Sequence, residues 1–286
     1  MKRFWNWDIH YACNYRCSYC FFADKWDVAT KANRYPGIKK WIEVWGKIYE
    51  KYGECHIHFS GGEPFIYPDF LDFISFLSNK FTLEFTTNLS FDVPNFIKII
   101  KPENAKINAS FHPEFADLDK FLNDILLLKR SKYSVCVSFV AYPPHLKMMS
   151  GFKNKFKEKE IDFIIQPFRG NYGQRTYPSG YTEPDKDLLK LCGTDLAVNK
   201  DIFDYHLKDK REEAKLCRMG QMYGKVYASA DVHKCCSTGA KKIGNLLQEN
   251  EFNLLKDPEA CDIKDCVCWK RMVVGEENKW SSHWQQ

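Results

Sequence analysis

The chain has 286 residues, of which 44% are hydrophobic and 16% are aromatic, enough for one large core or a core with a smaller appendage. The net charge of +5 is small and the Lys and Arg residues are scattered, so nothing predicts a nucleic-acid surface. No apolar run approaches the roughly 18 residues of a membrane span, and residues 1–3 do not open a signal peptide, so we expect a cytoplasmic protein. In a reducing compartment, the 12 cysteines indicate metal ligation more than disulfides.

Strands and helices alternate along the first 167 residues. Apolar residues recur at three and four positions in the helical segments, and short apolar runs separate them. The expected strands are 4–11, 55–60, 81–86, 106–111, 134–141 and 161–167, and the expected helices are 38–52, 68–79, 94–101, 117–130 and 144–159. This order predicts an α/β fold, a partial (β/α)6 TIM-like barrel with ligand sites at the carboxyl ends of parallel strands.

Two stretches do not follow this alternation. Residues 21–35, with mixed charges and aromatics, are expected to form a lid-like loop. Residues 169–184, rich in Gly, Pro, Tyr and Arg, indicate a linker or active-site loop, followed by a helical stretch from Asp185 and a cysteine-rich tail. We therefore predict a core barrel over residues 1–184 and a small cysteine-rich extension over residues 185–286.

Three cysteines follow the first predicted strand on one short loop. Cys13, Cys17 and Cys20 are spaced by four and three residues, so all three thiols can turn toward one metal centre. A [4Fe–4S] cluster usually takes four cysteines, so three leave one iron open to a ligand that is not protein. The alternative is structural zinc, which needs four nitrogen or sulfur ligands and for which His10 is a plausible fourth.

A glycine-rich turn, Gly61-Gly62-Glu63-Pro64, follows the second predicted strand. With the cysteine loop before it, at this separation, the chain resembles the radical S-adenosylmethionine (SAM) family. The resemblance implies a [4Fe–4S] cluster whose open iron binds SAM, and an electron donor such as flavodoxin or ferredoxin. Reductive cleavage of SAM then gives methionine and a 5′-deoxyadenosyl radical, while the protein orients SAM and excludes water from the site. An ordinary strand-to-helix turn is the alternative.

The resemblance also assigns SAM contacts. It implies that Gly61, Gly62 and Glu63 meet the methionine amino group, where glycine lets the backbone approach the ligand, and that Pro64 stiffens the exit. Tyr19 would pack on the adenine, unless it is only a core aromatic. Positions that match family contacts are Asn88 and Ser110. Polar residues at strand ends that are candidates by position alone, and that could instead cap helices, are His112, Ser138 and Gln166.

The tail holds a second group of cysteines, which resembles the SPASM/twitch extensions that carry auxiliary iron–sulfur clusters in radical SAM enzymes. The full form uses seven cysteines, and the pattern here is shorter, so we expect one auxiliary [4Fe–4S] cluster. Its expected ligands are Cys217, Cys235, Cys266 and Cys268, with Cys236 and Cys261 as alternates. A zinc-bound tail is the alternative, because four thiolates also suit zinc.

Three further residues are catalytic candidates. Arg169 and Arg175 lie in the loop that leaves the last strand and are suited to bind a carboxylate or phosphate, unless the loop is simply solvated. Cys192 is a candidate hydrogen-atom donor, with a buried structural thiol as the alternative.

We expect an oxidoreductase or epimerase that acts on a small polar substrate, such as a sugar, aminocyclitol or nucleotide-linked sugar. The reason is that the chain leaves no room for a separate peptide-recognition domain. The alternatives are radical modification of a peptide or protein side chain, and a non-enzymatic iron–sulfur or zinc module for redox or binding. We expect neither a nucleic-acid partner nor a membrane.

Overall fold

The computed structural model describes residues 2–193, 196, 216–237, 239–248 and 252–261. Its main sheet has nine strands in the order β11-β10-β9-β1-β2-β3-β4-β5-β6. The predicted parallel strands are β1 (Arg3–His10), β2 (Cys55–Gly61), β3 (Thr82–Thr87), β4 (Ala105–Ser110), β5 (Ser134–Ala141) and β6 (Asp162–Pro167). The predicted α/β fold is confirmed, and in the described part of the chain β11 and β6 are open edges, so the barrel does not close.

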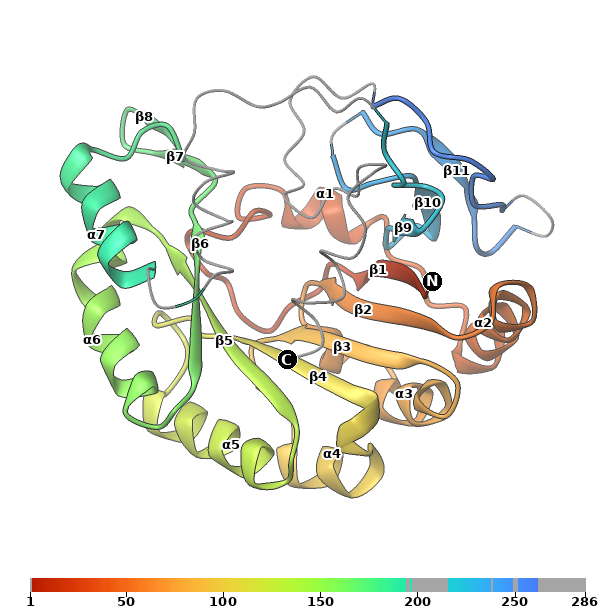
Figure 1. The fold of residues 1–286 in the computed structure, drawn as a ribbon, viewed down its shortest axis with the longest axis horizontal. Helices are drawn as coiled ribbons and strands as arrows, with labels where there is room; N and C mark the ends of the chain where they lie inside the picture. Colours follow the sequence, from red (N-terminus) through yellow and green to blue (C-terminus); the bar gives the residue numbers. More distant parts are fainter. Residues whose placement is uncertain (1, 194–195, 197–215, 238, 249–251, 262–286) are drawn as a thin grey trace.

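Helices lie in an arc outside the curved sheet (Figure 1). They are α2 (Ile38–Tyr52), α3 (Phe70–Ser78), α4 (Val93–Ile99), α5 (Leu118–Arg130), α6 (Leu146–Lys157) and α7 (Glu183–Gly193). Single turns of 3₁₀ helix occur at η1 (Pro64–Ile66), η2 (Pro102–Asn104) and η3 (Pro143–His145). The opposite, concave side of the sheet is not covered by these helices (Figure 1).

The core between sheet and helices is rich in aromatic side chains. Trp5 and Trp7 of β1 pack against Trp41 and Trp45 of α2, and all four are at most 1% exposed. The Trp7 and Trp41 rings are 4.7 Å apart at 69°. Such edge-to-face pairs contribute about 0.5–1.5 kcal/mol each beyond the burial of their area. This packing fixes which side of β1 faces the helices.

Because strand side chains alternate, the other side of the sheet carries the remaining residues of each strand. Most of these side chains on five neighbouring strands are polar and half-buried, although Val140 and Ile164 on the same side are apolar; the polar ones include His56, His58, Ser60, Thr86, Asn108, Ser110, Ser138 and Gln166. Some of them bond across the strands, as at 2.8 Å between His58 Nε2 and Thr86 Oγ1. The concave side is therefore a polar surface.

The C-terminal segment continues the same sheet. β9 (Tyr223–Val226) pairs in parallel with β1, and β10 (Asp231–His233) and β11 (Lys242–Asn245) follow as antiparallel strands. β9 and β10 form a hairpin around Ser229-Ala230-Asp231. Lys225 of β9 forms a buried ion pair with Asp8 of β1, at 2.5 Å between Nζ and Oδ1. The domain boundary near residue 185 stays a prediction.

Two predicted loops contain regular structure. Residues 21–35 include the short helix α1 (Trp26–Thr30), which has no buried residue and so no apolar pattern to predict it. Residues 169–184 include the two-stranded hairpin β7 (Gly170–Tyr172) and β8 (Arg175–Tyr177), together with the first residues of α7.

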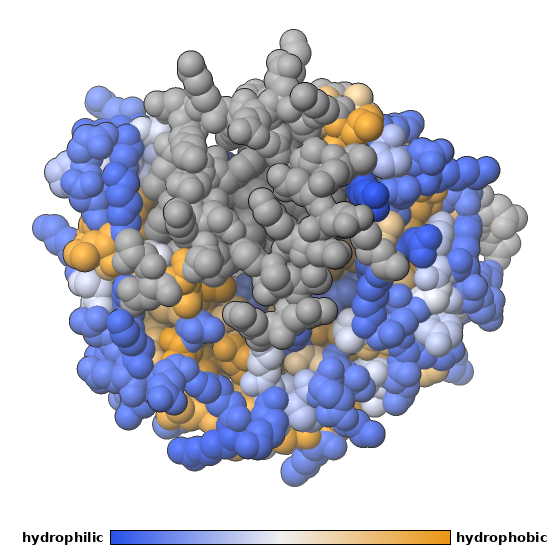
Figure 2. Space-filling view, viewed as in Figure 1, coloured by the Kyte–Doolittle hydropathy of each residue, from blue (hydrophilic) through white to orange (hydrophobic). Residues whose placement is uncertain are grey.

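Hydrophilic residues cover most of the described rim of the molecule in Figure 2, with hydrophobic residues between them. Within the described ranges, none of the helices combines the length and the apolar character that crossing a membrane requires.

Candidate active site

The glycine turn is hydrogen-bonded to the segment that enters the cysteine loop. The Gly62 N–H donates to the His10 carbonyl at 2.8 Å, and the Glu63 N–H donates to the Ala12 carbonyl at 2.9 Å. A Cβ on Gly62 would lie 1.9 Å from the Ala12 oxygen, so no side chain fits there. At Gly61, whose φ is +113°, a Cβ would lie 2.3 Å from the His10 oxygen. Both glycines are therefore needed for this backbone contact.

Glu63 connects this turn to the end of β3. Its carboxylate is 1% exposed and accepts hydrogen bonds from Thr87 Oγ1 at 2.8 Å, Asn88 N at 2.7 Å and Phe65 N at 3.1 Å. Burial raises the pKa of Glu63 to about 7, although these donors favour the charged form. The side chain of Glu63 is thus occupied in joining its own turn to the end of β3.

The charges of the three thiols of the cysteine loop act on one another, and two of the thiols meet backbone donors. The Tyr15 N–H points at Cys13 Sγ at 3.4 Å, and the Phe22 N–H points at Cys20 Sγ at 3.5 Å. Burial raises the pKa of Cys17 to about 12, and the charges of Cys20 and Cys13 act in the same direction. A coordinating metal offsets that cost because it deprotonates a thiol outright. Three cysteines on one loop, two of them with amide donors, are the type of ligand that an iron–sulfur cluster takes from a protein.

The structure does not offer His10 as a fourth ligand for zinc. His10 is 1% exposed, its Nε2 donates to the Glu63 carbonyl at 2.8 Å, and its Nδ1 lies 3.3 Å from the Tyr35 hydroxyl. Both ring nitrogens are thus engaged. Nor do any three His, Cys, Asp or Glu side chains in the described part of the chain form a site for a single metal ion.

Asn88, a SAM contact expected from the sequence, lies beside the cysteine loop. Its Nδ2 donates to Asn14 Oδ1 at 2.9 Å and lies 3.9 Å from Cys13 Sγ. Asn14 in turn donates to Ser90 Oγ at 2.8 Å. Sequence reasoning missed Asn14, although it follows a predicted ligand directly in the chain.

Tyr19 and His112 meet on the other side of the loop. The Tyr19 hydroxyl lies 2.9 Å from His112 Nδ1, and the Tyr19 ring packs against Tyr142 with centroids 5.1 Å apart. Burial lowers the pKa of His112 to about 4, so its imidazole is neutral near pH 7. Tyr19 is 5% exposed.

Glu114 is a second residue that sequence reasoning missed. Its carboxylate accepts hydrogen bonds from Ser18 N at 2.8 Å and Ser18 Oγ at 2.5 Å, and His145 Nε2 lies 3.5 Å away. The one available signal was its place just after a predicted strand end, which is where ligand-binding loops of such barrels lie.

The remaining strand-end candidates lie on the concave side. Ser110 and Ser138 are register neighbours with their hydroxyls 3.1 Å apart, and Gln166 is half-buried near the end of β6. Arg169 is half-buried just beyond it, whereas Arg175 is exposed on β8, with its Nη1 3.5 Å from the Gly180 carbonyl.

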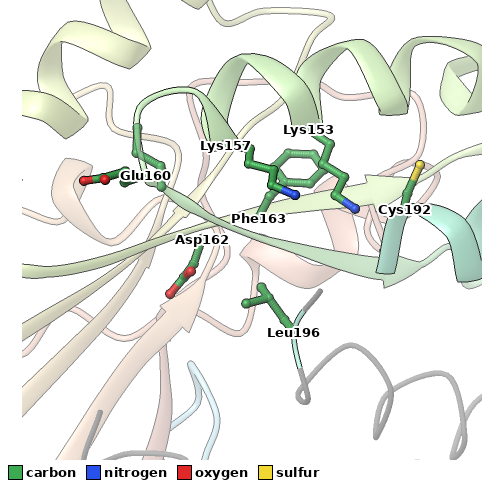
Figure 3. A pocket seen from close by; sticks show the side chains of 8 residues that line it. Lys153, Lys157, Glu160, Asp162, Phe163, Cys192 and Leu196 are labelled. Carbon is green, nitrogen blue, oxygen red and sulfur yellow. The ribbon is translucent and has the colours of Figure 1, made fainter. Parts of the chain in front are cut away.

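Cys192 lies near the amino end of β6, whereas the cysteine loop follows the carboxyl end of β1. It lines a pocket of 240 Å³ with Lys153, Lys157 and Asp162 (Figure 3). Asp162 is the first residue of β6, whereas the cysteine loop follows the last residue of β1, and the strands between them are parallel. Cys192 is 3% exposed. The structure therefore does not bring this thiol to the expected site of hydrogen transfer.

The second group of cysteines gathers beside β9. Cys217 and Cys235 are buried in one apolar cluster, and Cys236 and Cys261 pack against it. Backbone hydrogen bonds of 2.8 and 3.2 Å between Cys217 and Glu259 bring the two segments together. Cys266 and Cys268 lie outside the described residues. The two alternates named from the sequence are thus placed together with Cys217 and Cys235.

Comparison with known proteins gives the family of the core. No curated protein sequence matches the chain. Among solved structures, anSMEcpe with bound AdoMet and Cp18Cys peptide has a TM-score of 0.59 at 16% identity, covering 85% of this chain and 77% of that chain. Streptococcus suis SuiB bound to S-adenosylmethionine has a TM-score of 0.64 at 14% identity, covering 87% and 64%. SuiB bound to precursor peptide SuiA gives 0.62 at 15% identity, covering 87% and 63%.

At these identities the likeness shows a shared fold. The family comparison is more specific, because residues 7–140 match the radical SAM superfamily, and this range includes both the cysteine loop and the glycine turn. Members of that superfamily use a [4Fe–4S] cluster and S-adenosylmethionine. Residues 7–140 of this chain are therefore similar to the radical SAM superfamily.

Proposed function

We propose that Cys13, Cys17 and Cys20 hold a [4Fe–4S] cluster with one open iron, and that SAM binds there. The observation that carries this proposal is the direct hydrogen bonding between the glycine turn and residues 10–12, which brings the two motifs of the family together. When bound, the cluster and SAM supply the 5′-deoxyadenosyl radical. An electron donor such as flavodoxin or ferredoxin would reduce the cluster.

The chain's own residues would bind and orient SAM. The amides of Gly62 and Glu63 donate to carbonyls at residues 10 and 12, so contact with the methionine amino group falls to the carbonyl oxygens of the turn. Asn88 lies beside Cys13 and is suited to the same end of the ligand. Tyr19, with Tyr142 behind it, offers a ring for the adenine.

We further propose that the substrate is small and polar, such as a sugar, aminocyclitol or nucleotide-linked sugar. Support comes from the concave side of the sheet, where amide, hydroxyl and imidazole groups from neighbouring strands alternate with the buried core residues. Such groups match the hydroxyls of a polyol better than an apolar side chain. Ser110, Ser138 and Gln166 would contact the substrate on this side, and Arg169 would bind a substrate carboxylate or phosphate.

A peptide substrate is the second candidate. Two similar structures, anSMEcpe with bound AdoMet and Cp18Cys peptide and SuiB bound to precursor peptide SuiA, contain peptides. The exposed arginine of the β7–β8 hairpin, Arg175, is suited to a longer ligand that extends beyond the concave side.

Deuterium transfer distinguishes the two substrates. The reconstituted protein would be incubated anaerobically with SAM, a strong reductant and uniformly deuterated sugars, aminocyclitols or nucleotide sugars, and in parallel with deuterated peptides. We expect 5′-deoxyadenosine heavier by one mass unit with a member of the first set. Transfer from the peptides alone would overturn the small-substrate proposal.

The same reaction mixture reports the outcome. A dehydrogenated product loses two hydrogens, whereas an epimer made in D₂O gains one deuterium from an exchangeable donor. Epimerisation needs a donor that returns a hydrogen atom, and Cys192, the candidate donor, lies at the amino ends of the strands, away from the cysteine loop. We therefore propose dehydrogenation and expect the loss of two hydrogens.

We also propose an auxiliary [4Fe–4S] cluster in the tail. Cys217 and Cys235 would be ligands, completed by Cys236 and Cys261 or by Cys266 and Cys268. Replacing Cys217 by Ala should lower the iron content from about eight to about four per chain without abolishing SAM cleavage, since a cluster of this type holds four irons. An iron content near four in the unaltered protein would contradict the second cluster.

A further inference from the structure

The cysteine loop is bonded to the loop that follows β4. Ser18, which lies between two of the cysteines, donates both its N–H and its hydroxyl to the Glu114 carboxylate, at 2.8 and 2.5 Å. A carboxylate bonded twice by one residue fixes that residue's position, because it accepts through both oxygens. The contact spans 96 residues of sequence.

Two neighbouring contacts hold the same pair of loops. The Tyr19 hydroxyl meets His112 Nδ1 at 2.9 Å, and the rings of Tyr15 and Phe115 stack with centroids 5.2 Å apart. The loop around Glu114 is itself fixed, since the Phe115 N–H donates to the His112 carbonyl at 3.0 Å. The Glu114 carboxylate thus lies between two loops that are held together by these contacts.

The charge of Glu114 lies beside the cysteine loop, because its carboxylate is bonded to Ser18, which follows Cys17 directly in the chain. His145 Nε2 lies 3.5 Å from this carboxylate, but burial lowers the pKa of His145, which keeps the imidazole neutral near pH 7. The side chain of Glu114 is 23% exposed, so solvent screens the charge only in part.

We propose that Glu114 is a positioning residue that holds the cysteine loop through Ser18 and keeps the reduction potential of its cluster low. This inference rests on the proposed function. A nearby negative charge disfavours the reduced cluster, and a backbone N–H bonded to a carboxylate is withheld from the cluster sulfurs, where it would raise the potential. Both effects make the reduced cluster a stronger reductant, which SAM cleavage requires.

Two substitutions separate charge from position. Glu114→Gln removes the charge and keeps an acceptor for Ser18, whereas Glu114→Asp keeps the charge and shortens the reach by one methylene. Glu103→Gln is the matched control, because Glu103 lies in η2, just before the start of β4, whereas Glu114 follows its end. The readouts are the midpoint potential of the reconstituted cluster without SAM, and amide hydrogen exchange of residues 13–20 in the metal-free protein.

For Glu114→Gln we expect about a tenfold higher ratio of reduced to oxidised cluster at fixed applied potential, which is a positive shift of about 59 mV for one electron. For Glu114→Asp we expect a potential near that of the unaltered protein but faster exchange in residues 13–20. Glu103→Gln should change neither quantity. An unchanged potential in Glu114→Gln, or a shift as large in Glu103→Gln, would overturn the inference.

This test stands apart from the test of function. A cluster that forms without cleaving SAM would refute the proposed function and leave the potentials measurable. If the protein cleaves SAM but the midpoint potential of Glu114→Gln equals that of the unaltered protein, only the role of Glu114 is refuted.

Discussion

At the scale of single residues, Glu63 gives the stability of the fold a dependence on pH. Its carboxyl group is buried, and that burial raises its pKa from 4.5 to about 7. Between these values the folded chain holds a proton that the unfolded chain has released. The contribution of Glu63 to the free energy of unfolding therefore falls as pH rises from about 4.5 to about 7, by at most about 1.4 kcal/mol per pH unit.

Glu63→Gln removes this titration. We expect the unfolding free energy of the metal-free protein, relative to the variant, to decrease between about pH 5 and about pH 7, as measured by urea denaturation with the linear extrapolation. A difference that does not depend on pH would show that the carboxyl group titrates at its ordinary pKa and that the three donors outweigh burial.

At the scale of elements, the turn between β2 and η1 depends on the absence of a side chain. In Gly62→Ala the new Cβ would lie 1.9 Å from the Ala12 carbonyl oxygen, so the turn and the cysteine loop must separate. We expect about 1–3 kcal/mol of lost stability, as for other overpacked sites. We also expect about tenfold weaker SAM binding by equilibrium dialysis, which corresponds to about 1.4 kcal/mol.

Gly46→Ala is the matched control for that change. Gly46 lies inside α2, and a Cβ there meets nothing within 4 Å. Alanine in a helix interior is favoured over glycine by about 0.5–1 kcal/mol, so this variant should gain stability and bind SAM normally. Equal losses in both variants would mean that the contact with Ala12 has no special role.

At the scale of the whole molecule, the buried ion pair between Lys225 and Asp8 joins the C-terminal strands to the barrel. Lys225→Met leaves the Asp8 carboxylate, whose side chain is 14% exposed, with the Ser60 hydroxyl as a donor but without its cation, and should cost less than the roughly 3–5 kcal/mol of a fully buried pair. Lys242→Met breaks the exposed pair with Asp231 and should cost about 0–1 kcal/mol. We expect tryptophan fluorescence to report a single unfolding transition, with a lower denaturant midpoint only in Lys225→Met. Similar shifts of the midpoint in both variants would contradict this prediction.

The sequence predicts the repeated strands and helices because each one buries a regular apolar face, as Trp41 and Trp45 do in α2. It also predicts the two motifs, because they are local. The sequence does not predict contacts between distant segments: Glu114 contacts Ser18 across 96 residues, and β9 pairs with β1 from the far end of the chain. Helix α1 was not predicted for another reason, since a short helix without buried residues leaves no periodic pattern.

The most direct test of the radical SAM site is the formation of 5′-deoxyadenosine. The protein would be reconstituted anaerobically with iron and sulfide, reduced, and given SAM, with single alanine variants of Cys13, Cys17 and Cys20 treated alike. We predict 5′-deoxyadenosine and methionine in equal amounts from the unaltered protein and neither above background from any of the three variants. A fully loaded, reduced cluster that yields no 5′-deoxyadenosine with SAM under any condition, with or without substrate, would contradict the account.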